Sequence, residues 1–181
     1  MGRQAETSVP RPGWHRCERV LRHKPGARHV PIRETLRPAS RLLQASIFVD
    51  TSAFYALADR SDRFHSSAKR FLETNTSVLI TSNLVVHETI TLVRMRLGHS
   101  AAVQFGRRLF DEALTPLLRV IPSEEQQAWD LFQRYHDKRF SFVDCTSFTL
   151  MQRHQIPAAF AFDLDFRRLG HWVVYPTDAD L

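Results

Sequence analysis

Short apolar runs alternate with longer segments of helical periodicity along most of the chain. A short apolar run bounded by polar or turn-forming residues is typical of a buried strand, whereas apolar residues that recur every three or four positions predict a helix. On this basis strands are predicted at 47–49, 78–81, 117–121, 159–162 and 172–175, and helices at 52–58, 64–73, 83–96, 101–114, 123–135 and 142–154. Strands that alternate with helices in this way predict a parallel sheet covered by helices on both faces, so the fold class is α/β.

Local signals mark two of the helix ends. Gly98 ends the helix predicted at 83–96, because glycine readily adopts the left-handed conformation that closes helices. Ser123 and Gln126 have the spacing of a capping box, which predicts the first turn of the helix at 123–135. The sequence contains no internal repeat.

Residues 1–45 do not follow this pattern. They contain five of the nine prolines and little apolar periodicity, so they should bury too little surface to offset the entropy lost on ordering. We therefore expect a flexible basic N-terminal arm at 1–45 and one folded domain at 46–178. An over-extended gene start explains residues 1–45 equally well, and both explanations stay open.

The charge of the chain is divided unevenly. Residues 1–45 carry nine Arg and one Lys against three Glu, a net charge of +7, whereas the remainder carries 15 basic and 16 acidic residues, a net charge of −1. A pI of about 10.0 would usually indicate nucleic-acid binding. Here that inference applies to the arm and not to a groove of the folded domain.

The composition narrows the class of protein. The chain has 181 residues, of which 43% are hydrophobic and 24% charged, as expected of a single globular domain. No stretch approaches the roughly 18 uninterrupted apolar residues of a membrane span. Cys17 and Cys145 could form at most one disulfide. We expect a cytoplasmic protein that does not span a membrane.

Two aspartates follow predicted buried strands. Asp50 comes directly after 47–49, and Asp163 comes directly after 159–162. In open α/β sheets, ligands bind at the edge formed by the carboxyl ends of the strands, so both residues are candidates for a site. Aspartate is also common at helix N-caps and in turns, and for either residue alone this is the better explanation.

Two further carboxylates lie in predicted helices. Glu88 is four residues from both Leu84 and Leu92, on or beside the stripe that should face the core, where an unpaired carboxylate is costly. Pairing with a distant Arg is the structural alternative. Asp144 completes a capping-box-like sequence that begins at Ser141, so a cap and a ligand explain it equally well.

Considered together, these carboxylates favour a common site above the sheet. Several carboxylates in a small volume raise one another's pKa unless a cation neutralises them. Oxygen ligands select Mg²⁺ or Mn²⁺ over zinc, which prefers His or Cys. Such an ion can activate water and stabilise the charge that develops on a phosphodiester. The reaction class indicated is metal-assisted phosphodiester hydrolysis.

Four short motifs surround these carboxylates, and in chain order they are Phe48–Ala53, Val86–Thr89, Ser141–Phe148 and Ala161–Phe166. Together they resemble the motifs of PIN-domain nucleases, in particular the VapC-type toxins of bacterial and archaeal toxin–antitoxin pairs. The resemblance covers about 47–176. It implies a three-layer α/β/α fold with a short central parallel sheet, Mg²⁺- or Mn²⁺-dependent endoribonuclease activity, a homodimer, and inhibition by a cognate antitoxin.

The resemblance also implies roles for individual residues. The family's acidic quartet matches Asp50, Glu88, Asp144 and Asp163. Asp50 and Asp144 would bind the metal, directly or through water, and Asp163 would complete the metal site. Glu88 would bind metal or orient the attacking water, and the sequence does not separate these two roles.

The chain departs from the family pattern near the last motif. Relatives often have Thr or Ser where this chain has Ala161, which would remove a supporting hydrogen bond, and some have His where it has Asp165. We favour Asp163 over Asp165 for the site because Asp163 directly follows the predicted strand. Thr51 or Ser52 matches the family's hydroxyl position beside the first Asp.

A nuclease must also hold RNA, and four basic residues lie near the predicted site. Lys138 and Arg139 come just before the helix of Asp144, and Arg167 and Arg168 come just after Asp165. Basic residues in such places contact phosphates in nucleic-acid-binding proteins, but many are merely solvated.

Two other functions stay open. A phosphotransferase of the haloacid dehalogenase type also has an Asp at the end of its first strand, but it needs a second Asp two residues later, where this chain has Ser52. A non-catalytic RNA-binding or interaction module could share the fold without turnover.

Overall fold

The structure is a computed structural model that describes residues 40–110 and 115–177. The predicted arm lies outside the described residues up to position 39, as do residues 111–114 of the helix predicted at 101–114. The last residues of the predicted arm belong to the folded part. They form the short helix α2 (Ser40–Leu43), and Leu43 is buried in the core.

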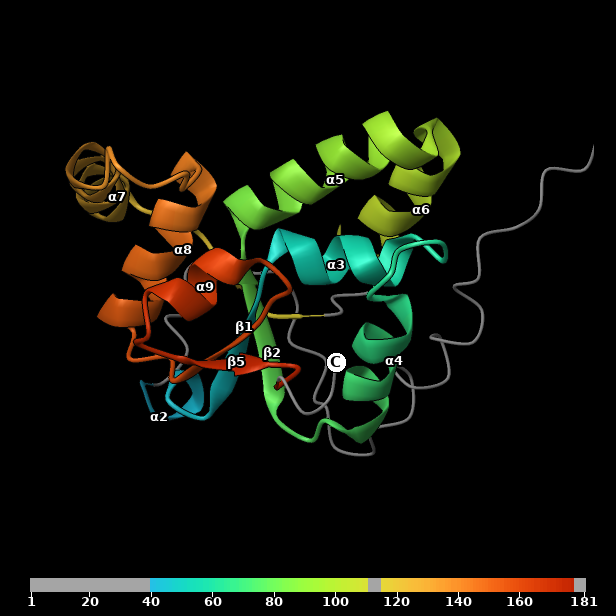
Figure 1. The fold of residues 1–181 in the computed structure, drawn as a ribbon, viewed down its shortest axis with the longest axis horizontal. Coiled ribbons are helices and arrows are strands. Elements are labelled where there is room, and N and C mark those ends of the chain that lie inside the picture. Colours follow the sequence, from blue (N-terminus) through green and yellow to red (C-terminus); the bar gives the residue numbers. More distant parts are fainter. Residues whose placement is uncertain (1–39, 111–114, 178–181) are drawn as a thin grey trace, which may run out of the picture.

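A parallel sheet of five short strands forms the centre of the described structure (Figure 1). Its order is β3-β2-β1-β4-β5, and all four neighbouring pairs are parallel. The strands are β1 (Ser46–Val49), β2 (Val78–Ser82), β3 (Leu117–Leu118), β4 (Ala158–Phe160) and β5 (Val173–Tyr175). Every residue of the central strand β1 is buried, as expected of a strand covered on both faces.

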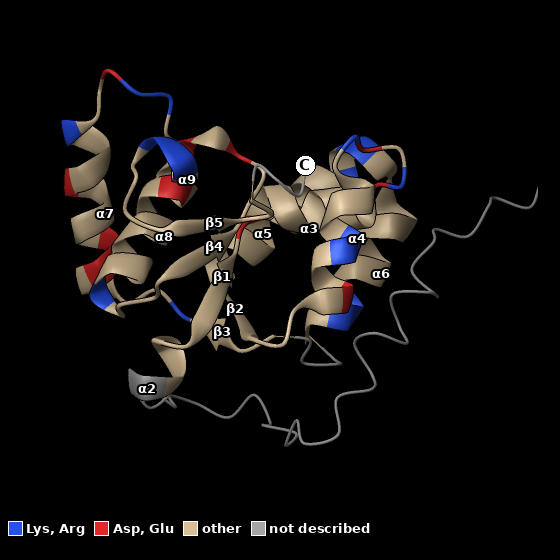
Figure 2. Ribbon diagram, turned by 60° about the horizontal axis from the view of Figure 1, so that its bottom comes forward, with Lys and Arg blue, Asp and Glu red and all other residues tan. Residues whose placement is uncertain are grey.

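Helices cover both faces of the sheet. Figure 2 shows the strands between two groups of helices, α3 to α6 on one side and α7 to α9 on the other. The first group is α3 (Thr51–Ala58), α4 (His65–Thr74), α5 (Asn83–Leu97) and α6 (His99–Phe110); the second is α7 (Pro122–Arg134), α8 (Phe142–Arg153) and α9 (Leu164–Arg168). The predicted α/β class with three α/β/α layers is confirmed.

The strand order creates a switch point in the middle of the sheet. From β1 the chain moves outward to β2 and β3, and it then returns to β4 and moves outward to β5 on the other side. The direction of winding therefore reverses between β1 and β4, which are hydrogen-bonded neighbours with Val49 opposite Phe160. Ligands of doubly wound sheets bind beyond the strand ends at such a point.

Three predicted boundaries are wrong. The strand predicted at 117–121 spans only Leu117–Leu118, because the N–H of Val120 bonds to Oδ1 of Asn83 and not to a strand. The predicted strand at 159–162 ends at Phe160, because the N–H groups of Phe162 and Asp163 bond to a side chain on α3 and not to a strand.

The third wrong boundary is the start of helix α7. This helix begins at Pro122, and its N-cap is Ile121, whose N–H donates to the carboxylate of Glu124 over 3.1 Å. The capping box predicted at Ser123 and Gln126 is therefore displaced by two residues. The error arose because Ser is a more common cap than Ile.

The described residues contain no helix that is long and apolar enough to cross a membrane.

Candidate active site

Asp50 lies at the end of the central strand, beside the switch point. Its N–H continues the sheet by donating to the carbonyl of Phe160 over 3.0 Å, and its side chain caps α3. Oδ2 accepts hydrogen bonds from the N–H of Ser52 (2.9 Å) and from the hydroxyl of Ser52 (2.5 Å). Asp50 is only 3% exposed. The capping role predicted for Asp50 is present, and it places the carboxylate at the ligand-binding edge of the sheet.

Glu88 reaches the same region from α5. Its Oε2 accepts a hydrogen bond of 2.5 Å from the hydroxyl of Thr51, the residue that follows Asp50. Glu88 is half-buried and makes no ion pair with any described residue, so the predicted alternative of a distant Arg is not observed. The carboxylate is therefore held by a neutral hydroxyl that leaves its charge uncompensated.

Asp144 occupies the first turn of α8 and forms the predicted capping box. The N–H of Ser141 donates to Oδ2 of Asp144 over 2.7 Å, and the N–H of Asp144 donates to the hydroxyl of Ser141 over 3.0 Å. The cap uses Oδ2 and leaves Asp144 without an ion pair among the described residues. A capping role and a role in a site are thus compatible for this residue.

Asp163 and Asp165 have different environments. Asp163 is exposed and caps α9, with Oδ1 accepting from the N–H of Asp165 over 2.9 Å. Asp165 is 7% exposed, and its Oδ1 forms an ion pair of 2.8 Å with Nη1 of Arg168. Asp165 is thus paired with Arg168, whereas Asp163 makes no ion pair with any described residue.

Electrostatic interactions couple Asp144 to the other carboxylates of the candidate site. Burial raises the pKa of Asp50 to about 7, against hydrogen bonds from Ser52 that lower it, and the charge of Asp144 raises it further. Burial likewise raises the pKa of Asp144 to about 6, against its bonds to Ser141, and the charges of Asp163 and Glu88 add to the rise. No described Lys or Arg pairs with any of these four carboxylates.

The chemistry of this donor set fits a hard divalent cation. Carboxylate oxygens are its preferred ligands, and a cation would neutralise carboxylates whose pKa values are raised by burial and, to a smaller extent, by one another's charge. Within residues 40–110 and 115–177, no three His, Cys, Asp or Glu side chains are already gathered as a metal cage. Mg²⁺ does not need such a cage, because it usually takes one or two protein carboxylates and completes its coordination with water and substrate phosphate.

Three of the four predicted RNA contacts already have a partner. Lys138 pairs with its neighbour Asp137 at 2.9 Å, Arg167 donates from Nη2 to the carbonyl of Pro176 over 2.6 Å, and Arg168 pairs with Asp165. Arg139 is exposed, and no described residue pairs with it. Figure 2 shows basic residues both in the loop before α8 and on α9.

The comparisons with known proteins identify the family of the chain. Residues 47–171 match the PIN domain family. Over 131 residues the chain is 41% identical to the 23S rRNA-specific endonuclease VapC20 of Mycobacterium tuberculosis, covering 72% of this chain and 98% of that protein. The chain belongs to the PIN-domain family, with the VapC-type toxins.

One further relative of this VapC-type PIN domain and one solved structure extend the comparison. The chain is 26% identical over 117 residues to the ribonuclease VapC26 of M. tuberculosis, covering 65% of this chain and 86% of that protein. The crystal structure of M. tuberculosis VapC20, described as a sarcin-ricin loop cleaving toxin, matches with a TM-score of 0.65 and 39% identity, covering 69% of this chain and 95% of that one.

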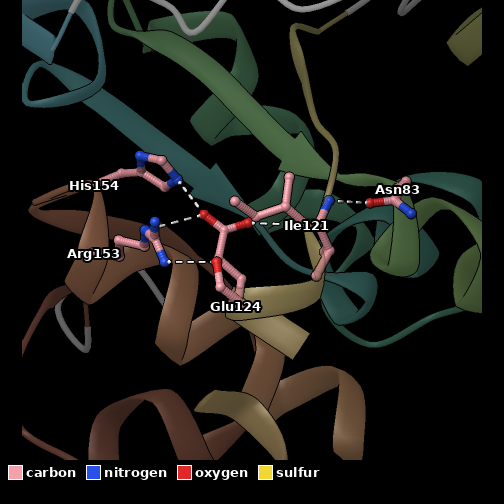
Figure 3. Close-up of polar contacts among 7 residues, drawn as sticks. Asn83, Ile121, Glu124, Arg153 and His154 are labelled. Carbon is pink, nitrogen blue, oxygen red and sulfur yellow. Dashed lines mark hydrogen bonds and ion pairs between the residues drawn. The ribbon is translucent and has the colours of Figure 1, made fainter. Parts of the chain in front are cut away.

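One polar cluster in this PIN domain was not predicted from the sequence. Figure 3 shows the buried carboxylate of Glu124, which accepts from the N–H of Ile121 and contacts two residues at the end of α8. Its Oε1 lies 3.1 Å from Nε2 of His154 and 3.5 Å from Nε of Arg153. The cluster fastens the start of α7 to the end of α8. Sequence reasoning missed it because Glu124 was assigned to the wrong position of the cap.

Proposed function

We propose that this VapC-type PIN domain is the endoribonuclease toxin of a toxin–antitoxin pair, and that it hydrolyses RNA phosphodiester bonds with Mg²⁺ or Mn²⁺ at a four-carboxylate site. One observation carries the proposal. Neighbouring hydroxyls on α3, those of Thr51 and Ser52, hold Glu88, Asp50 and the N–H of Asp163 beside the switch point. Asp144 interacts electrostatically with all three of these carboxylates, and no described Lys or Arg pairs with Asp50, Glu88, Asp144 or Asp163. The names of VapC20 and VapC26 as nucleases support the same conclusion.

The proposed site divides its tasks among these residues. Asp50 and Asp144 would hold the cation, directly or through water, and Asp163 would complete its protein ligands. A bound Mg²⁺ or Mn²⁺ supplies a Lewis acid that lowers the pKa of water and stabilises charge on the phosphodiester. Glu88, fixed through Oε2 by Thr51, would use its other oxygen to bind the cation or to accept a hydrogen bond from the attacking water.

The RNA backbone would be held by basic residues around the site. Arg139 is the strongest of the four candidates, because its charge has no partner in the described part of the chain. Lys138, Arg167 and Arg168 would reach phosphate only by sharing or exchanging their present partners. The similarity to VapC20 makes 23S rRNA the substrate that we propose to test first.

The remaining features follow from the family and are proposals for this chain. We propose a cognate antitoxin that covers the site, a homodimer, and a cytoplasmic location. A non-catalytic RNA-binding module is the alternative that the test below must separate from a nuclease. No observation favours a phosphotransferase of the haloacid dehalogenase type, since Ser52 stands where that chemistry needs a second Asp.

The test is cleavage of a 23S rRNA fragment that contains the sarcin-ricin loop, with Mg²⁺ or Mn²⁺ and with EDTA. We expect metal-dependent cleavage by the native chain and a loss of about 100-fold or more in Asp50→Asn. Asp130→Asn, which changes an exposed aspartate on α7, should cleave at the native rate. Binding of the fragment without cleavage by the native chain would favour the non-catalytic module. Full cleavage by folded Asp50→Asn would refute the assigned site.

A further inference from the structure

The hydroxyl of Ser52 joins two segments that are 110 positions apart in the chain. It donates to Oδ2 of Asp50 over 2.5 Å, and it accepts from the N–H of Phe162 over 2.9 Å and from the N–H of Asp163 over 3.2 Å. A hydroxyl offers one donor and two acceptor positions, so Ser52 uses all of them. The oxygen therefore lies between the carboxylate that follows β1 and the turn that follows β4.

The turn after β4 depends on this hydroxyl for its place. The N–H of Ala161 still bonds to the neighbouring strand, through the carbonyl of Tyr175 at 3.0 Å. The next two N–H groups, of Phe162 and Asp163, have no acceptor among the described residues other than Ser52. Ala161 has no hydroxyl of its own to anchor this turn.

We propose that Ser52 is the positioning residue that sets the place of Asp163 relative to Asp50. The inference rests on the proposed function, because it assigns both aspartates to one site. Groups that act together must be held to within about 0.5 Å of their working geometry. Ser52 acts through Oδ2 of Asp50 and through the backbone of Asp163, and it needs no contact with RNA.

Three variants isolate this role. Ser52→Ala removes all three hydrogen bonds, whereas Ser52→Thr keeps a hydroxyl at the same position. Ser61→Ala is a matched control, because the N–H and hydroxyl of Ser61 bond to Oδ1 of Asp59 over 2.9 and 2.6 Å in the same local pattern. Asp59 and Ser61 lie between α3 and α4, apart from the turn after β4.

The first readout is amide hydrogen exchange of the native chain and the variants, measured by NMR. In Ser52→Ala, exchange at Phe162 and Asp163 should be at least about tenfold faster, because both N–H groups lose their acceptor. Exchange at Phe160, which belongs to β4, should stay unchanged. Ser52→Thr and Ser61→Ala should exchange as the native chain does at all three amides.

The second readout is RNA cleavage. Ser52→Ala should lower kcat about 10- to 100-fold and change KM less than about twofold, since a misplaced group affects the transition state more than binding. Ser52→Thr should recover most of kcat, and Ser61→Ala should be unchanged. An equal loss in Ser61→Ala would overturn the proposal, because it would indicate a general effect of losing a serine.

Two different failures can be told apart. Native exchange at Phe162 and Asp163 in folded Ser52→Ala would overturn the role of Ser52, whatever the activity. Absence of cleavage by the native chain would refute the proposed function instead. If Ser52→Ala does not fold, Ser52→Cys, which fills the same space but forms only weak hydrogen bonds, carries the same expectations.

Discussion

The hydroxyl of Thr51 donates a hydrogen bond of 2.5 Å to Oε2 of Glu88, and this bond joins the first turn of α3 to the second turn of α5. These helices follow the neighbouring strands β1 and β2. The contact therefore holds Glu88 close to the end of β1, where Asp50 begins the next helix. A residue 37 positions away is thereby brought to the candidate site.

Replacing Thr51 by Val tests the importance of this bond. Val keeps the shape of the side chain but cannot donate, so Glu88 should lose its orientation. We expect kcat for RNA cleavage to fall about tenfold and the free energy of unfolding to fall by about 1 kcal/mol. Thr91→Val is the control, because the hydroxyl of Thr91 bonds only to a carbonyl of its own helix. Equal kcat values for Thr51→Val and Thr91→Val would contradict the assignment.

The raised pKa values predict how stability without metal depends on pH. Asp50 and Asp144 have folded pKa values of about 7 and 6, above the ordinary value of 3.8 that applies to the unfolded chain. Between about pH 4 and pH 7 the folded state therefore binds more protons than the unfolded state. The contribution of these two residues to stability is present below pH 4 and is lost as the pH rises, by at most about 1.4 kcal/mol per pH unit for each group.

Urea unfolding at a series of pH values in EDTA measures this effect. The native chain should lose stability relative to Asp50→Asn as the pH rises from 4 to 7, so that Asp50→Asn is the more stable protein at pH 8. Comparing the two proteins cancels the contributions of titrating groups that do not interact with Asp50, such as Asp59, whose pKa is lowered. A lower stability of Asp50→Asn at pH 8 would mean that the capping role of Asp50 outweighs the cost of its buried charge and of the repulsion by Asp144.

The cluster around Glu124 makes a separate prediction about the fold. Glu124 is 3% exposed and bonds to the N–H of Ile121, to His154 and to Arg153. Replacing it by Ala would remove the one buried acceptor that these three partly exposed donors share, so the free energy of unfolding should fall by about 1 to 2 kcal/mol. Glu125→Ala changes an exposed neighbour in the same turn and should have little effect. Similar losses in both variants would show that the contacts to α8 contribute little.

The sequence predicted the sheet and its helices because their apolar periodicity is strong. It also predicted Asp50 as a strand-end carboxylate, since strand ends are visible in a single sequence. The boundaries at β3, β4 and α7 were wrong because side chains distant in sequence, Asn83 and Ser52, accept the local backbone N–H groups, or because an uncommon cap was used. Such partners become visible only when the fold brings them together.

The choice between Asp163 and Asp165 shows the same limit. Both aspartates follow β4 in sequence, and only the structure reveals that Asp165 is buried and paired with Arg168 while Asp163 remains exposed. The hydrogen bonds of Ser52 to both Asp50 and the turn after β4 could not be predicted either. A serine near the start of a helix is common and does not indicate a distant partner.

Arg139 gives a prediction about RNA binding. Since Arg139 has no described partner, its removal should cost one phosphate contact without disturbing the fold. Arg139→Ala should weaken binding to all RNA sequences alike and should reduce the slope of log K against log salt concentration by about 1. Lys69→Ala is the control, because Lys69 is a partly buried lysine of α4 whose charge already pairs with Glu73 over 3.7 Å. An unchanged salt slope in Arg139→Ala would place the RNA elsewhere.

The most direct measurement of the central claim is anomalous diffraction from crystals of the chain soaked in Mn²⁺, with Asp144→Asn crystals as the comparison. We predict an anomalous peak bounded by carboxylate oxygens of Asp50 and Asp144, beyond the ends of β1 and β4, and a much weaker peak in Asp144→Asn. A native crystal with no peak beside Asp50, or an equal peak in Asp144→Asn, would contradict the account.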